Sequence, residues 1–269
     1  MKSRWAKGIL TVVGAVLLST LGIFASDALQ GIDSGIGNLA SVGKSGTCQS
    51  GSVPLKVEGN LICVDLYEAS PGKGCPYQKP SSAVETERNA TAEGCYAASV
   101  PKVQPWTYVS LPQAQRMCSG AGKRLPTNEE WYHLALGTKV ENCTVDASSV
   151  SATGKETCTS DIGAYDAVGN VWEWIDGTVI DGSYDGRALP PEGYVTSVDS
   201  SGIAITSSET PDELYGSDYV WTKAEGTLGM IRGGYYDSAE DAGLYTINAS
   251  VLTSFATQGI GFRCVEDVM

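Results

Sequence analysis

The eight cysteines of this chain constrain its fold more than any other feature. All of them follow an apolar N-terminal segment, and an even number of cysteines in an exported chain predicts four disulfides. Metal binding is the weaker interpretation, because the chain has no CxxC motif and its one histidine lies apart from the cysteines. Eight cysteines permit about a hundred pairings, but closure of short loops favours three local bridges and leaves one long one. The predicted pairs are Cys48–Cys63, Cys75–Cys95, Cys143–Cys158 and Cys118–Cys264.

The N-terminus has the features of an export segment. Residues 1–7 are basic, and residues 8–25 form an uncharged, mostly apolar run. The small residues around Ala28 favour cleavage after that position, whereas the length of the run also suits an uncleaved membrane anchor, so both fates remain open. We expect a secreted or cell-surface protein. Its predicted parts are a signal or anchor at 1–28, a linker at 29–47 and a domain at 48–269.

The charge balance excludes several classes of partner. Eighteen Lys and Arg residues against thirty-one Asp and Glu residues give a net charge of −13. Such a protein repels phosphate backbones, so we expect no binding of nucleic acid, and contact with a membrane only through residues 8–25. His133 is the one histidine, which excludes His-rich metal sites and most histidine-dependent catalysis. We expect His133 to be structural.

Two helices followed by short strands predict an α+β domain in which irregular segments outweigh regular ones. Ser110 with Gln113, and Thr127 with Glu130, have the spacing of capping pairs at the start of two helices, and glycines follow each helix. Beyond residue 140 the chain has β-rich runs separated by turn residues. These runs are VWEWI, YVTSV, IAITS, YVWT, GMIRGGYY and IGFRCV.

Several strings occur in a fixed order: ICVDLYEAS (62–70), GKRLPTNEEW (122–131), AVGNVWEW (167–174), and MIRGGYY and GIGFRCV (230–265). Together they resemble the motifs of the sulfatase-modifying-factor family, the formylglycine-generating enzymes and their relatives. The resemblance covers roughly residues 48–269 and implies the irregular, C-type-lectin-like fold of that family. Each motif also has a structural explanation: RLPT forms a turn and a helix cap, Trp172 and Trp174 suit a core, and Arg263 suits a buried ion pair.

The chain departs from the enzymes of this family at the positions that carry their chemistry. The resemblance implies two copper-binding thiols after the RGG motif, at the places that Ser238 and Gly243 occupy here. Neither residue supplies the thiolate that Cu(I) prefers. The iron-dependent branch of the family needs three histidines, and this chain has one. We therefore predict no copper, no iron and no catalytic residues on a retained scaffold.

A calcium site is implied around the GNVWEW turn. The family's ligands there correspond to the side chains of Asp166 and Glu173 and to the carbonyl oxygens of Gly169 and Val171. Two carboxylates and two backbone oxygens suit a hard cation, so we expect a structural calcium ion. The alternative is that Glu173 caps a turn or pairs with Arg263.

The segment between the RGG and GFR motifs predicts a recognition surface. Residues 235–258 are rich in Tyr, Ser, Asn, Asp and Thr, a composition typical of adaptable binding surfaces. The segment also resembles the variable segment of retroelement-diversified proteins, although an ordinary solvated loop has a similar composition. We expect a protein or glycan ligand on this acidic, Tyr- and Ser-rich face. The predicted contact residues are Tyr235, Tyr236, Asp237, Ser238, Glu240, Asp241, Ser250, Val251, Leu252, Thr253 and Ser254.

Two other functions remain open. The first is an enzyme, either a formylglycine-generating oxidase with unusual residues or an unrelated hydrolase. Glu240 and Asp241 are poorly arranged for joint acid–base catalysis, because neighbouring residues on an extended segment point to opposite sides. The second is a structural envelope or filament component that displays the domain on its N-terminal segment, which is compatible with binding.

Overall fold

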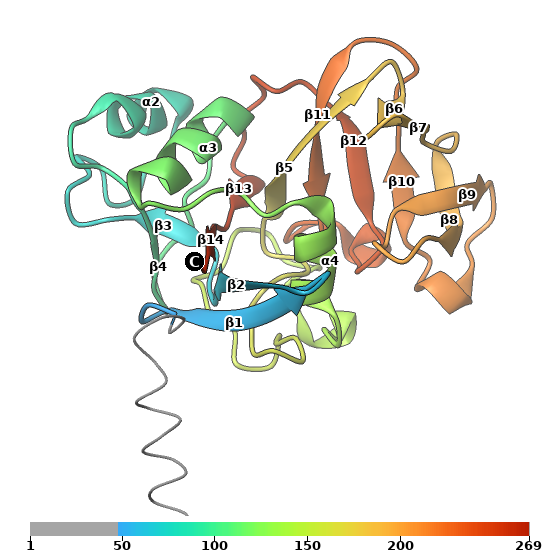
Figure 1. Ribbon diagram of the computed structural model, residues 1–269, viewed down its shortest axis with the longest axis horizontal. Coiled ribbons are helices and arrows are strands. Elements are labelled where there is room, and N and C mark those ends of the chain that lie inside the picture. The colour runs from blue at the N-terminus through green and yellow to red at the C-terminus, as the bar shows by residue number, and fades with distance from the viewer. Residues whose placement is uncertain (1–47, 269) are drawn as a thin grey trace, which may run out of the picture. The chain divides into compact units, whose positions relative to one another are not determined.

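The computed structural model describes residues 48–268, which form one compact unit (Figure 1). The predicted signal or anchor at 1–28 and the linker at 29–47 lie outside the described residues. Within the described part of the chain, no helix is long and apolar enough to cross a membrane.

Both predicted helices are present with the predicted caps. α3 (Leu111–Gly120) begins after Ser110, and α4 (Asn128–Ala135) begins after Thr127. In each helix the third residue returns its side chain to the backbone of the cap, which completes a capping box. His133 lies on α4, where its Nδ1 is 2.9 Å from the carbonyl oxygen of Glu129, in a structural position.

The structure contains a third helix that we did not predict. α2 (Ala83–Thr91) is mostly polar, so its sequence has no clear apolar stripe. Its local signal is the spacing of Ser82 and Glu85: the Ser82 side chain accepts a hydrogen bond from the Glu85 backbone N–H. That pattern could have identified the helix from the sequence.

The strands form one large sheet and two small ones. In the large sheet the order is β7-β6-β5-β11-β12-β10-β8-β9, and β13 pairs with β5 in parallel. Its strands are β5 (Trp172–Ile180), β6 (Ser183–Tyr184), β7 (Arg187–Ala188), β8 (Gly193–Val198), β9 (Ala204–Ser208), β10 (Tyr219–Trp221), β11 (Thr227–Arg232), β12 (Ile247–Val251) and β13 (Ile260–Phe262). The small sheets are β1 (Ser52–Val57), β2 (Asn60–Asp65) and β14 (Val265–Asp267), and β3 (Ala69–Pro71) with β4 (Ala97–Ser99).

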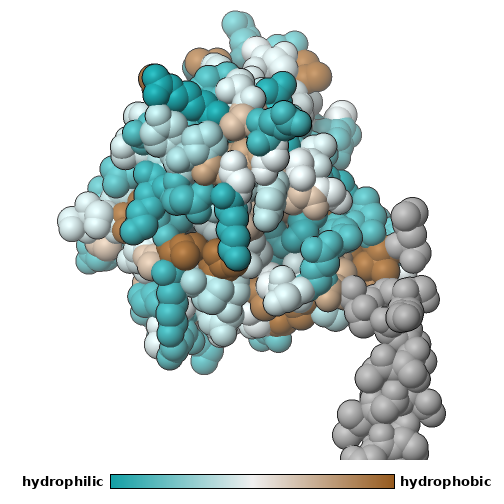
Figure 2. All heavy atoms as spheres, turned by 90° about the vertical axis from the view of Figure 1, so that its left-hand side faces the viewer, coloured by the Kyte–Doolittle hydropathy of each residue, from teal (hydrophilic) through white to brown (hydrophobic). Residues whose placement is uncertain are grey.

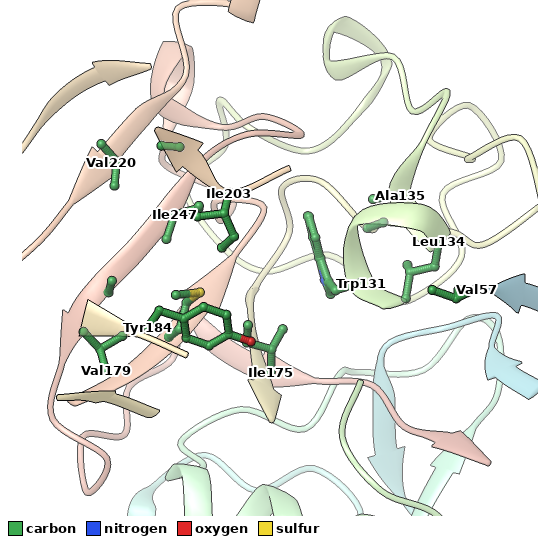
Figure 3. Close-up of a cluster of buried hydrophobic side chains, with 14 of the residues drawn as sticks. Val57, Trp131, Leu134, Ala135, Ile175, Val179, Tyr184, Ile203, Val220 and Ile247 are labelled. Atoms are coloured by element: carbon green, nitrogen blue, oxygen red, sulfur yellow. The ribbon is translucent and has the colours of Figure 1, made fainter. Parts of the chain in front are cut away.

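Two hydrophobic clusters pack against the large sheet, one on each face. The first joins α4 and the β1–β2 hairpin to one face of the sheet, with Trp131, Ile175 and Val220 among its members (Figure 3). The second lies under α2 and α3 and takes Trp172 and Trp174 from the opposite face of β5. Because side chains alternate along a strand, β5 contributes to both clusters.

All four predicted disulfides are confirmed. Cys48–Cys63 and Cys143–Cys158 each span 15 residues and Cys75–Cys95 spans 20, whereas Cys118–Cys264 spans 146 and ties α3 to the C-terminal segment. Four bridges fit folding in an oxidising compartment. The predicted fold class, an irregular, disulfide-rich α+β domain, is confirmed as well.

Candidate functional site

The GNVWEW motif forms a tight turn into β5. Asp166, Gly169 and Asn170 all have positive φ angles, a conformation that Gly, Asn and Asp tolerate best. A Cβ atom on Gly169 would lie 2.4 Å from the carbonyl oxygen of Thr144, so only glycine fits there. The sequence of this turn is therefore explained by its backbone.

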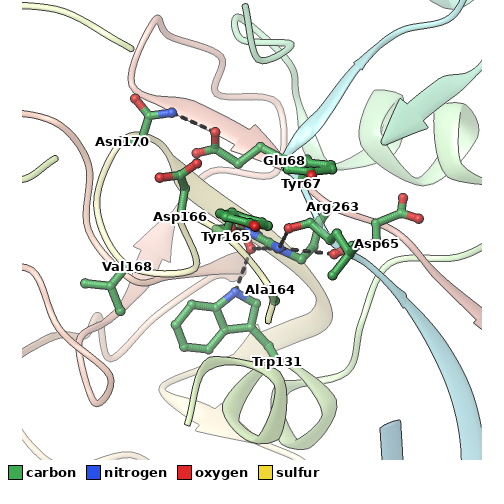
Figure 4. Close-up of polar contacts among 12 residues, drawn as sticks. Asp65, Tyr67, Glu68, Trp131, Ala164, Tyr165, Asp166, Val168, Asn170 and Arg263 are labelled. Carbon is green, nitrogen blue, oxygen red and sulfur yellow. Dashed lines mark hydrogen bonds and ion pairs between the residues drawn. The ribbon is translucent and has the colours of Figure 1, made fainter. Parts of the chain in front are cut away.

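The motifs meet at a buried ion pair between Glu173 and Arg263 (Figure 4). Arg263 Nη2 lies 2.6 Å from Glu173 Oε1, and both side chains are fully buried. Trp131 Nε1 donates to Glu173 Oε2 at 2.8 Å, and the Arg232 guanidinium lies 4.7 Å from the Trp131 ring centre. Arg263 also donates to the carbonyl oxygen of Tyr165. The motifs that carry the family resemblance thus supply buried polar side chains that bind one another and stabilise the fold.

Both predicted calcium-binding carboxylates have other partners. Glu173 pairs with Arg263, the alternative that the sequence left open, and Asp166 Oδ2 accepts the backbone N–H groups of Gly154 and Lys155 at 2.6 and 3.2 Å. In the described part of the chain, no group of three or more His, Cys, Asp and Glu side chains is arranged to hold a metal ion. A cation at this turn would need backbone oxygens as ligands.

A third buried carboxylate, Glu68, lies beside this turn. Its Oε2 accepts the Asn170 amide at 2.6 Å, whereas its Oε1 is buried without a partner. Figure 4 shows the Glu68 and Asp166 carboxylates turned toward each other. Burial, and then the charges of Asp166 and Glu173, raise the pKa of Glu68 well above its usual value. Three buried carboxyl groups, those of Glu68, Asp166 and Glu173, thus lie near the Arg263 guanidinium, and an added cation would favour the ionised form of Glu68.

The loop at residues 235–241, which we call the recognition loop, is anchored by backbone hydrogen bonds. The Tyr236 N–H donates to Asn170 O, and the Ala239 N–H donates to Val145 O. Ser238, a predicted contact residue, accepts the Tyr235 N–H through its hydroxyl at 2.9 Å, so it also holds the loop. Its remaining predicted contacts are exposed or half-buried: Tyr235, Tyr236, Asp237, Glu240 and Asp241.

The second predicted stretch begins at the end of β12. Ser250 and Thr253 are half-buried, and Leu252 and Ser254 are exposed. Val251 is buried within the second core cluster, which removes it from the predicted contacts. The chain then returns past Tyr235, since a Cβ atom on Gly259 would lie 2.7 Å from the Tyr235 ring.

Four aromatic side chains form a row of contacting rings near the recognition loop; sequence reasoning placed Trp172 in the core, where it lies, and missed Tyr194, Tyr219 and Trp221. Tyr194 packs edge-on against Tyr219 with ring centres 5.1 Å apart, Tyr219 lies 4.6 Å from Trp221, and Trp221 lies 5.8 Å from Trp172. We call these four residues the aromatic row. The alternation Tyr219-Val220-Trp221, with Val220 in the core, was the local signal that two rings lie on the outer face of β10.

A scan against family models matches residues 63–268 to the sulfatase-modifying factor enzyme 1-like domain. The chain belongs to this family. A cattle (Bos taurus) relative named inactive C-alpha-formylglycine-generating enzyme 2 is 28% identical over 141 residues, which is 40% of this chain and 46% of that protein. The mouse (Mus musculus) protein of the same name is 27% identical over 141 residues, with 40% and 45% covered. The chain thus matches less than half of the length of these relatives.

Solved structures of similar proteins have low sequence identity. The Major Tropism Determinant I1 variant is 16% identical with a TM-score of 0.47, covering 82% of this chain and 54% of that one. Treponema denticola variable protein 1 is 12% identical with a TM-score of 0.40, covering 81% and 100%.

Ser238 and Gly243 occupy the two places where the family resemblance implies copper-binding thiols. A Cβ atom at Gly243 would lie 1.7 Å from a carboxylate oxygen of Asp218, so even a cysteine side chain could not fit without rearrangement. All eight cysteines of this chain are in disulfides.

Proposed function

We propose that this protein is an exported or surface-displayed binding protein that recognises a protein or a glycan without catalysing a reaction. Recognition takes place on the recognition loop, residues 250–254 and the aromatic row. Residues 8–25 direct export and, where they are retained, anchor the chain in a membrane.

The absence of suitable catalytic groups supports a binding role. Ser238 uses its hydroxyl to hold the recognition loop, and Gly243 is packed under Asp218. With every cysteine in a disulfide, the copper chemistry of the family has no thiolate to use. The names of both mammalian relatives describe inactive enzymes, which fits the same interpretation.

The half-buried aromatic side chains are the observation that carries the proposed binding role. Tyr235 and Tyr236 pack edge-on with ring centres 5.0 Å apart, and Trp221 and Tyr235 are both partly buried against the second core cluster. Partly exposed Tyr and Trp side chains on a rigid support are typical of binding hot spots.

The experiment is a screen of the full-length protein against protein and glycan arrays, followed by single variants. Tyr236→Ala and Trp221→Ala are each expected to lower the affinity for a partner by about thirtyfold, because losing an aromatic anchor typically costs about 2 kcal/mol of binding free energy. Ser250→Ala is expected to have little effect. Tyr96→Ala is the matched control, because Tyr96 is an exposed tyrosine that follows Cys95 near β4, outside the proposed surface. If the affinity for a partner is unchanged in Tyr236→Ala and Trp221→Ala but falls in Tyr96→Ala, the proposed binding surface is wrong.

The enzyme alternative has its own test. A sulfatase-derived peptide with its target cysteine is incubated with the protein, copper and oxygen, and its mass is followed. We expect the cysteine to remain. Conversion to formylglycine would overturn the proposal of a binding protein.

For calcium we propose a modified ligand set. Asp166 and the carbonyl oxygens of Gly169 and Val171 would hold the ion, with Glu68 as the second carboxylate because Glu173 is engaged by Arg263. The neighbouring Glu68 and Asp166 carboxyl groups and the unpartnered Glu68 Oε1 support this site, and about seven oxygens suit the ion. Calcium should then raise the melting temperature of the wild-type protein. The response should disappear in Glu68→Gln and persist in Glu141→Gln, a variant of an exposed glutamate. An equal response in both variants would refute the site.

A further inference from the structure

Three rings of the aromatic row, those of Tyr194, Tyr219 and Trp221, lie on a part of the large sheet that the helices leave open, whereas Trp172 is buried in the second core cluster. β8 and β10 send Val195 and Val220 into the first core cluster, so Tyr194, Tyr219 and Trp221 point to the opposite face. α3 packs against β5. In Figure 1, α2 and α3 lie at the other end of the domain from β8, β9 and β10. This leaves three half-buried rings facing solvent.

The side of the molecule that carries α2, β3 and β4 has a different character. Figure 2 shows that hydrophilic side chains surround small apolar patches there. The exposed apolar residues of these segments are single and separate, such as Val84 at the start of α2 and Val100 just after β4. Isolated exposed residues of this type are common on soluble proteins.

Carboxylates lie beside the aromatic row. The Tyr219 hydroxyl donates to Glu192 Oε1 at 3.4 Å, and burial followed by the charges of Glu192 and Asp241 raises the pKa of Tyr219. Within residues 48–268, neither carboxylate has a Lys, Arg or His side chain within ion-pair distance. Two carboxylates that make no ion pair within residues 48–268 therefore lie near these rings.

This combination favours one kind of ligand. The face of an aromatic ring attracts a cation, most strongly for Trp, and nearby carboxylates add to that attraction. A second copy of this chain is disfavoured because each copy carries a net charge of −13. An extended sugar chain that stacks on several rings at once is disfavoured because neighbouring rings of the row are inclined by 84°, 46° and 85°, which leaves no shared plane.

We propose that Tyr219 and Trp221, together with Glu192 and Asp241, bind arginine or lysine side chains of a protein partner. The proposal rests on the proposed binding function and specifies the chemistry of its ligand. A guanidinium or ammonium group would lie over the Trp221 or Tyr219 ring and pair with a neighbouring carboxylate.

The test uses two synthetic peptides and the full-length protein. One peptide alternates arginine with glycine and serine, and the other replaces each arginine by citrulline, which keeps the shape and removes the charge. Isothermal titration calorimetry at low salt should give an affinity at least about tenfold higher for the arginine peptide, or about 1.4 kcal/mol. Equal affinities, or no binding of the arginine peptide at millimolar concentration, would overturn the proposal.

Variants separate this site from general attraction to an acidic protein. Trp221→Ala, and the pair Glu192→Gln with Asp241→Asn, should each reduce the affinity for the arginine peptide by about tenfold. Glu141→Gln removes a distant carboxylate and should leave it unchanged, and Lys223→Gln, two residues beyond Trp221, should not weaken it. Equal losses in Glu141→Gln and in the site variants would contradict the proposal. If a partner found on the arrays loses affinity in Trp221→Ala but is neutral or acidic, the proposed binding function is supported and the proposal of a cationic ligand is wrong.

Discussion

The bridge between Cys118 and Cys264 should stabilise the domain more than any of the three short bridges. A disulfide restricts the unfolded chain more strongly when it closes a longer loop. Cys118–Cys264 closes a loop of 146 residues and Cys48–Cys63 one of 15. In the chain-entropy relation these loops correspond to about 5 and about 3 kcal/mol, so removal of the long bridge should cost about 2 kcal/mol more. Both sulfurs of the long bridge are fully buried, which adds the cost of a cavity.

The measurement is urea unfolding of variants in which both cysteines of one bridge are replaced by alanine, followed by far-UV circular dichroism. The Cys143–Cys158 bridge provides a matched control, because it also spans 15 residues. We expect the two short-bridge variants to lose similar stability, and the Cys118→Ala/Cys264→Ala variant to lose clearly more. The reasoning fails if the long-bridge variant is as stable as either short-bridge variant.

Three further predictions follow from buried charges. Glu173→Ala leaves Arg263 buried without its partner and should lower the free energy of unfolding, measured in urea, by about 3–5 kcal/mol. As a control, Arg187→Ala breaks a partly exposed pair with Asp199 and should lower it by about 1 kcal/mol or less. Similar losses in the two variants would contradict this prediction. Burial raises the pKa of Asp218 to about 7 from 3.8, so its contribution to stability is full below about pH 4 and is lost as the pH rises through 7. Asp218→Asn should therefore lose less stability than the wild type between pH 5 and 8, by up to about 3 kcal/mol, and parallel curves would refute the shift. Chelation of calcium should lower the melting temperature of the wild type but not of Glu68→Gln; no change in the wild type would exclude the site.

Much of the fold could be predicted because its signals are local. Ser110 and Thr127 begin helices through contacts three residues away, and the short loops of three disulfides identify their pairs. α2 was missed because its polar sequence gives no apolar stripe, although Ser82 and Glu85 have capping spacing.

The candidate site was harder to predict because it depends on distant contacts. Glu173 matches a calcium ligand by position, yet its carboxylate is taken by Arg263, 90 residues away in sequence. Likewise, Trp172 and Trp221 come from β5 and β10, which meet only through the order of strands in the large sheet. Val251 lies in a segment whose composition predicts binding, but its position in β12 points its side chain into the core.

Photo-crosslinking from the recognition loop tests recognition on this face most directly. A photoreactive phenylalanine derivative is placed at position 236 in one protein and at position 96 in another, and each is irradiated with a partner identified on the arrays. Binding through the recognition loop and the aromatic row predicts a crosslinked product from position 236 and none from position 96. A crosslink from position 96 alone would show that the partner binds elsewhere and would contradict the account.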